Sequence, residues 1–152
     1  MRVCFDTSVL VPALVAPHPF HARALWWVEA AAKGEIEGVM AWHAAAETWS
    51  VLTRLPISPP VTAILAERLV GQLARHIRPL AMAGSHYRAA LQRCAERGAR
   101  SGAVFDALHL VIAEASQAQV LATFNPADFE RLSNQSGPRI VVPPDPPKVT
   151  AR

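Results

Sequence analysis

The chain has little cysteine and no long apolar run, and both features narrow what it can be. Cys4 and Cys94 are its only two cysteines, and their spacing fits neither a disulfide framework nor a CxxC motif. No apolar stretch reaches the roughly 18 residues needed to span a bilayer. The opening MRVCFDTSVLV, interrupted by Asp6, does not read as a secretory signal. We therefore expect a reduced, cytoplasmic protein that does not associate with membranes.

Common nucleotide, zinc and hydrolase signatures are also missing. GxGxxG, GxxxxGK[ST] and HExxH do not occur, and no Ser-His-Asp order is evident. Lysine is scarce, since thirteen of the fifteen basic residues are arginine, and the net charge is +3. Arginine suits bidentate contact with phosphate, so a polyanionic partner is favoured. A GC-rich genome would also enrich arginine, so this bias alone does not decide the function.

The distribution of apolar residues predicts one α/β domain. The chain has 152 residues, of which 51% are hydrophobic, enough for a sizeable core. Apolar runs without strict alternation predict buried parallel strands, and amphipathic segments between them predict helices. The expected strands are residues 2–5, 38–42, 77–81, 120–123 and 139–142. The expected helices follow Asp6 and Asn125 and cover residues 20–33, 43–54, 61–75, 85–97 and 103–117.

A change of composition marks the end of this domain. From Pro143 the chain reads PPDPPKVTAR, a segment that we expect not to pack and to form an extended or mobile tail. Residues 1–142 are therefore predicted to form a single domain, and residues 143–152 a proline-rich tail.

Aspartate is rare, and its placement is informative. Of four aspartates, Asp6 and Asp128 follow predicted strands, as does Glu47, at or near the start of a helix. In an open parallel sheet such positions meet at the carboxyl edge, where ligands bind. Asp106 begins a helix that is apolar nearly all round, which places an acid toward the interior.

Each acid also has a plain structural explanation. Asp6 could cap a helix, while Glu47 and Asp106 could complement a helix dipole. Asp128 could belong to a capping box behind Asn125. Taken together, however, several carboxylates at one sheet edge would repel one another unless a cation were bound. Oxygen ligands favour Mg²⁺ or Mn²⁺, and the chemistry that uses such a site is phosphodiester hydrolysis.

The residues around these acids resemble four motifs of the PIN-domain ribonucleases. VCFDTSVLVPAL resembles the first, AAAETWSVLTRLP the second, SGAVFDALHLVIAEA the third and LATFNPADFERL the fourth. Together they extend over residues 1–142. Short single domains of this kind most resemble the VapC toxins of bacterial toxin–antitoxin pairs. The resemblance implies a PIN-like three-layer α/β/α fold around a mostly parallel sheet of four to five strands.

The resemblance also implies roles for individual residues. Asp6, Glu47 and Asp106 would form the acidic core, with Asp6 and Asp106 as metal ligands. Asp128 would be a fourth catalytic acid, although some members carry the acid where Asn125 stands. Supporting side chains would be Thr7, Ser8, Thr123 and Asn125. The implied function is Mg²⁺- or Mn²⁺-dependent cleavage of RNA by a homodimer that a cognate antitoxin inhibits.

Further residues leave alternatives open. His109 lies three residues after Asp106 and shares its helical face, so it could border the site or be a core histidine. Arg54 lies about two helical turns after Glu47 and could contact RNA or the antitoxin. One of the adjacent Trp26 and Trp27 must point away from the core, whereas core packing accounts for the other tryptophans. A catalytically silent RNA- or protein-binding module and a nuclease that is not a toxin remain alternative functions.

Overall fold

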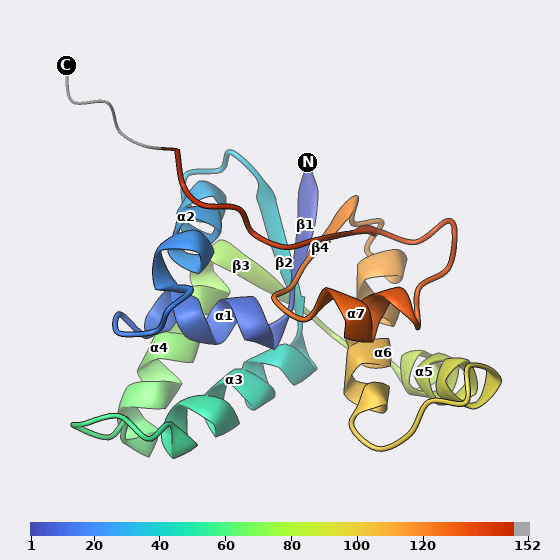
Figure 1. Ribbon diagram of the computed structural model, residues 1–152, viewed down its shortest axis with the longest axis horizontal. Helices are drawn as coiled ribbons and strands as arrows, with labels where there is room; N and C mark the ends of the chain where they lie inside the picture. Colours follow the sequence, from blue (N-terminus) through green and yellow to red (C-terminus); the bar gives the residue numbers. More distant parts are fainter. Residues whose placement is uncertain (148–152) are drawn as a thin grey trace.

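The computed structural model describes residues 1–147, and the predicted tail residues 148–152 lie outside this range. Within it the chain alternates strands and helices (Figure 1). The strands are β1 (Arg2–Phe5), β2 (Glu37–Ala41), β3 (Ile77–Leu80), β4 (Val120–Ala122) and β5 (Arg139–Val141). The helices are α1 (Thr7–Leu14), α2 (His21–Ala32), α3 (Trp42–Arg54), α4 (Ala63–His76), α5 (Gly84–Glu96), α6 (Ala103–Ala115) and α7 (Pro126–Glu130).

The strands form one parallel sheet in the order β3-β2-β1-β4-β5. The chain builds outward from β1 through β2 to β3, and then returns to the other side of β1 with β4 and β5. The order therefore reverses between β1 and β4. A crevice outside the carboxyl ends of the strands is expected at such a point, and ligands bind there in open α/β sheets.

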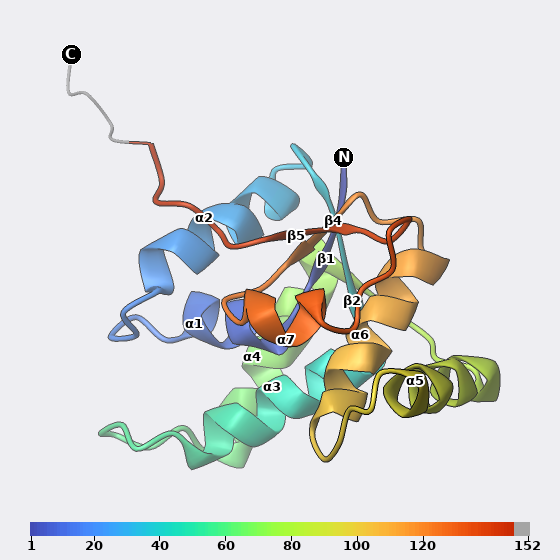
Figure 2. The ribbon, with the colours of Figure 1, turned by 45° about the vertical axis from the view of Figure 1, so that its right-hand side comes forward.

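Helices cover both faces of the sheet (Figures 1 and 2). Side chains of β1 alternate between two apolar clusters: Val3 and Phe5 pack with α1, α2 and α4, while Cys4 packs with α5, α6 and α7. Because both faces are buried, the strands read as continuous apolar runs. The predicted three-layer α/β/α class is thus confirmed, with all five strands parallel.

Glycine accounts for helix ends and for close packing. Gly34 and Gly98 follow α2 and α5 with φ of +74° and +62°, a conformation that glycine adopts readily at a helix end. Gly38 in β2 has a different role, because a Cβ there would lie 3.0 Å from the Cβ of Ala31 and 3.2 Å from Ile77 Cγ1. A larger residue would separate α2 from the sheet.

Three expectations require correction. Pro143 is buried and its carbonyl accepts a 2.7 Å hydrogen bond from Arg23 Nε, so the start of the tail packs against α2. Of the tryptophans, Trp27 is buried and Trp26 is 38% exposed as predicted, but Trp42 and Trp49 are also exposed rather than part of the core.

The third correction concerns α6, which was expected to be buried nearly all round. Phe105 in the first turn of this helix is 44% exposed, and its ring stacks on that of His43 in α3 with the centroids 5.0 Å apart. Within residues 1–147, no helix is long and apolar enough to cross a membrane. The division of the chain at residue 142 remains a prediction.

Candidate metal centre at the carboxyl edge of the sheet

Asp6 lies at the point where the strand order reverses. Its backbone continues β1, with its N–H bonded to Ala122 O at 3.0 Å, and its carbonyl accepts bonds from the first turn of α1. The side chain makes no capping bond, so the helix-cap explanation does not hold for it. Instead, Asp6 Oδ2 accepts hydrogen bonds from Ser8 Oγ at 2.6 Å and from Thr123 Oγ1 at 2.8 Å.

The two hydroxyls fix this carboxylate from both sides. Ser8 Oγ accepts the backbone N–H of Phe124 at 2.9 Å, and Thr123 Oγ1 accepts that of Asn125 at 2.9 Å. Each hydroxyl therefore donates to Asp6 and accepts from the loop after β4. Asp6 is only 5% exposed. The network joins the ends of β1 and β4 and leaves Asp6 Oδ1 free of these bonds.

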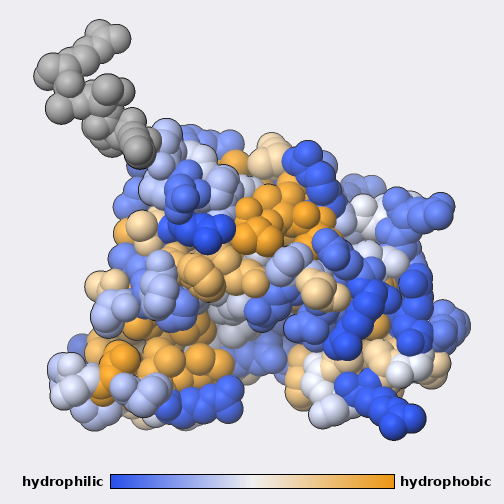
Figure 3. All heavy atoms as spheres, in the orientation of Figure 1, coloured by the Kyte–Doolittle hydropathy of each residue, from blue (hydrophilic) through white to orange (hydrophobic). Residues whose placement is uncertain are grey.

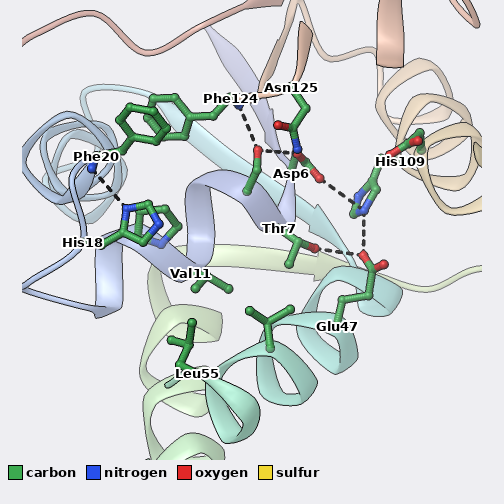
Figure 4. A pocket seen from close by; sticks show the side chains of 14 residues that line it. Asp6, Thr7, Val11, His18, Phe20, Glu47, Leu55, His109, Phe124 and Asn125 are labelled. Carbon is green, nitrogen blue, oxygen red and sulfur yellow. Dashed lines mark hydrogen bonds and ion pairs between the residues drawn. The ribbon is translucent and has the colours of Figure 1, made fainter. Parts of the chain in front are cut away.

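Glu47 reaches the same region from the second turn of α3. Its Oε2 accepts a 2.9 Å hydrogen bond from Thr7 Oγ1 and lies 3.0 Å from His109 Nε2 (Figure 4). The same His109 nitrogen is 3.5 Å from Asp6 Oδ1. His43 approaches from the other side, with its Nε2 3.4 Å from Glu47 Oε1. Two acids from different elements therefore share one buried histidine.

The electrostatics of this cluster favour an ion pair. Burial would raise the pKa of Glu47, but the hydrogen bond and positive charge of His109, together with the bond from Thr7, lower it overall. Burial would likewise lower the pKa of His109. The bond to Glu47 and the negative charges of Asp6 and Glu47 outweigh burial and raise the pKa of His109. His109 is thus buried, but it is held by acids rather than by an apolar core.

Asp106 shows the opposite behaviour. It lies in the first turn of α6 and is partly buried. Burial raises its pKa from 3.8 to about 6, and the negative charges of Asp6 and Asp128 act in the same direction. Positive charge from His109 offsets only part of this. The ionised form of Asp106 is therefore disfavoured, because the nearby positive charges do not compensate for its burial and for the neighbouring acids.

These side chains line one pocket with a volume of about 400 Å³. Asp6, Glu47 and Asp106 contribute to it from three different elements, and Thr7, Ser8, Asn125 and His109 line it as well. Within residues 1–147, no three His, Cys, Asp or Glu side chains already converge as a metal cage. Such an open arrangement fits Mg²⁺, which keeps several waters and is held by one or two carboxylates together with substrate phosphate oxygens.

Three of the candidate residues, Thr123, Asp128 and Arg54, lie outside the pocket lining. Asp128 is 50% exposed at its side chain and lies 3.5 Å from Arg131 NH2, one turn further along the chain. Its negative charge adds to the burial and to the Asp6 charge that raise the pKa of Asp106. Asn125, at the alternative position for the fourth acid, does line the pocket, without a capping bond from its side chain. Arg54 is exposed at the end of α3.

Sequence reasoning missed the aromatic part of the pocket. His18 and Phe20 line it from the loop between α1 and α2, and Phe124 lines it from the loop after β4. Phe124 had a usable signal, since it follows Thr123 at the carboxyl edge of the sheet. His18 and Phe20 lie in a proline-containing loop with no periodic pattern. Their position depends on how α2 returns across the sheet.

Comparison with known proteins finds a matching domain family and relatives that are similar over most of the chain. Residues 3–135 match the PIN domain. Ribonuclease VapC27 of Mycobacterium tuberculosis (strain ATCC 25618 / H37Rv) is 36% identical over 119 residues, which cover 78% of this chain and 80% of that protein. Ribonuclease VapC40 of M. tuberculosis (strain CDC 1551 / Oshkosh) is 34% identical over 117 residues, covering 76% and 81%.

Solved structures share the fold at low sequence identity. M. tuberculosis VapC20, a sarcin-ricin loop cleaving toxin, aligns with a TM-score of 0.65 and 16% identity over 90% of this chain and 99% of its own. VapBC2 from Rickettsia felis, bound to a DNA fragment from its promoter, aligns with a TM-score of 0.66 and 16% identity, covering 93% and 98%. At these identities the likeness concerns the fold alone.

Proposed function

The chain belongs to the PIN-domain family, and on this premise we propose that it is a divalent-metal-dependent endoribonuclease that hydrolyses RNA phosphodiester bonds. The observation that carries the proposal is the convergence of Asp6, Glu47 and Asp106 on one pocket. Their negative charges repel one another, and burial together with the charges of Asp6 and Asp128 raises the pKa of Asp106 to about 6. A bound cation would remove that conflict, and the pocket is open to substrate.

Asp6 and Asp106 are the proposed ligands of Mg²⁺ or Mn²⁺. Ser8 and Thr123 engage Asp6 Oδ2, so Oδ1 is the oxygen available to a cation. When bound, such an ion activates water and offsets negative charge on the attacking and leaving oxygens of the phosphodiester. Carboxylate side chains suit this ion, because its hard charge selects oxygen ligands.

The remaining site residues act through position and charge. Thr7 and His109 orient Glu47 from two sides, which directs its second oxygen, Oε1, toward His43. We assign Glu47 to the catalytic acids and Thr7, Ser8 and Thr123 to their support. Asp128 contributes negative charge near Asp106 as the proposed fourth acid, and Asn125 lies at the pocket rim. Arg54, exposed at the end of α3, is the candidate for contact with RNA or with a protein inhibitor. His109 is only 1% exposed and is paired with Glu47, so we assign it to positioning that acid instead.

A cleavage assay with matched variants tests this function. Purified wild-type protein should cleave RNA with Mg²⁺ or Mn²⁺ and lose the activity in EDTA. Asp6→Asn and Asp106→Asn should each reduce the rate by at least about 100-fold, as expected for loss of a metal ligand. Glu67→Gln is the control, because Glu67 is exposed on α4 and lies outside the pocket lining. Full activity of Asp6→Asn would refute the assignment.

We further propose that the protein is the cytoplasmic toxin of a toxin–antitoxin pair and acts as a homodimer. Its similarity to VapC27 and VapC40 over more than three quarters of the chain supports this role. Exposed Trp42 and Trp49 on α3, at 54% and 41%, offer apolar area for a protein interface. Expression should arrest growth, and Asp6→Asn should relieve the arrest without changing the mass measured by light scattering.

A further inference from the structure

Two stacked aromatic rings form the end of the pocket farthest from Glu47 (Figure 4). Phe20 precedes α2 and Phe124 follows β4, yet their ring centroids are 4.4 Å apart and the rings are inclined by only 19°. The proposed hydrolysis of a phosphodiester uses neither ring. Phe20 nevertheless lines the pocket and, although it stacks on Phe124, remains 38% exposed, so apolar ring surface is left uncovered there.

The ring pair is held in place by an arginine. The Arg23 guanidinium carbon lies 5.4 Å from the Phe20 centroid and 5.1 Å from that of Phe124, within cation–π range. Arg23 Nε also donates to Pro143 O at 2.7 Å and lies 3.8 Å from Asp145 Oδ1. Three chain segments, around residues 20, 124 and 143, therefore meet at this point. The pair is a built feature with positive charge beside it.

We propose that Phe20 and Phe124 form a stacking platform for an RNA base next to the scissile phosphodiester, an inference that rests on the function proposed above. The pocket has carboxylates at one end and flat aromatic rings at the other. A nucleotide has the same division, with a phosphate that a metal can hold and a base with a π-face. Arg23 adds positive charge that favours a polyanion, and the Asn125 side chain lines the pocket nearby with hydrogen-bonding groups.

An apolar side chain of a protein inhibitor is the competing occupant. Aliphatic residues that would suit it, Val11, Val51 and Leu55, line a separate wall of the same pocket near α1 and α3 (Figure 4). A base needs a planar partner, whereas an aliphatic side chain packs equally well on leucine. The shape of residue 20, rather than its hydrophobicity, therefore distinguishes the two occupants.

Fluorescence of a base analogue provides the test. The probe is an eight-nucleotide single-stranded RNA with one central 2-aminopurine, titrated with protein in EDTA so that no cleavage occurs. Wild-type protein should quench the fluorescence by stacking. Phe20→Ala and Phe20→Leu should both weaken binding by about 5- to 150-fold, the range for loss of one stacked base. Phe20→Tyr should bind like the wild type, because it keeps the ring.

Tyr87→Ala is the matched control, since Tyr87 is a 45% exposed aromatic residue on α5 outside the pocket. It should leave quenching and affinity unchanged. Absence of quenching by the wild type, or equal binding by Phe20→Leu and the wild type, would overturn the platform. So would a Phe20→Ala variant that binds the RNA normally and loses affinity only for a protein inhibitor.

A parallel cleavage assay separates this inference from the function on which it rests. The same proteins are given Mn²⁺ and total RNA. If the wild type cleaves and Phe20→Leu cleaves at the same rate, only the platform is refuted. If the wild type does not cleave RNA under any divalent ion, the proposed function itself fails. Lower cleavage by Phe20→Ala and Phe20→Leu, restored in Phe20→Tyr, supports both.

Discussion

Replacing Asp106 by asparagine should stabilise the metal-free protein while removing its ability to bind metal. The pKa of Asp106 rises from 3.8 to about 6, so the folded state binds this proton more tightly than the unfolded chain. Stability is therefore lost as the pH rises from about 4 to about 6, and the loss is complete above that range. Asparagine carries no charge and avoids this loss.

The size of the effect follows from the pKa. Each pKa unit corresponds to about 1.4 kcal/mol, which gives about 3 kcal/mol for the full change. Because Asp106 is only partly buried, screening by solvent reduces this to about 1–2 kcal/mol. For a domain of this length the melting temperature should rise by about 2–8 °C.

Thermal melts of Asp106→Asn and the wild type in EDTA measure this difference at pH 8 and at pH 4.5. The advantage of the variant should be largest at pH 8 and shrink as the pH falls. Asp145→Asn, with a 90% exposed side chain, should melt like the wild type at both values. Excess Mn²⁺ should raise the melting temperatures of the wild type and of Asp145→Asn but not that of Asp106→Asn, because the ion stabilises the state that binds it. A variant less stable than the wild type at pH 8 in EDTA would refute the reasoning.

Three further outcomes are expected. Thr123→Val should destabilise the protein by about 1.5–3 kcal/mol in urea denaturation, because it removes a buried bond to a carboxylate, whereas Thr53→Val in α3 removes only a solvent-exposed bond to a backbone carbonyl and should change little. Because the pKa of His109 is raised, its contribution to stability is complete below about pH 6.5 and is lost as the pH rises through the raised pKa. Because the pKa of Glu47 is lowered, its contribution is complete above about pH 4.5 and is lost as the pH falls through the lowered pKa. Metal-free wild type should therefore be stabilised by this pair most between about pH 4.5 and pH 6.5 and less on either side. His109→Gln should flatten this dependence of the melting temperature on pH. Cys4, whose pKa burial raises to about 12, should resist alkylation at pH 8 until the protein unfolds.

The positions of Asp6 and Glu47 could be predicted because each follows an apolar strand. A buried parallel strand is recognisable from its composition, and its carboxyl end must lie at the ligand-binding edge. The orientation of a side chain on a short helix could not be predicted in the same way. Asp128 points to solvent beside Arg131, since α7 is only five residues long and its direction depends on packing against α6.

Contacts between segments that are distant in the chain could not be predicted from the sequence either. The burial of Pro143 depends on Arg23, which is 120 residues away in the chain, and nothing local to the tail indicates it. The stack of Phe20 on Phe124 has the same origin. The helix-cap explanation for Asp6 was also reasonable from sequence, but its carboxylate accepts from the hydroxyls of Ser8 and Thr123 instead of from a backbone N–H of α1.

Calorimetric titration of Mn²⁺ into metal-free protein tests the central claim most directly, because the claim is that Asp6 and Asp106 hold a divalent ion. Wild-type protein should bind Mn²⁺, and Asp6→Asn should bind at least about 100-fold more weakly, while Asp145→Asn should bind like the wild type. Equal binding by Asp6→Asn and the wild type, or no binding by the wild type, would contradict the account.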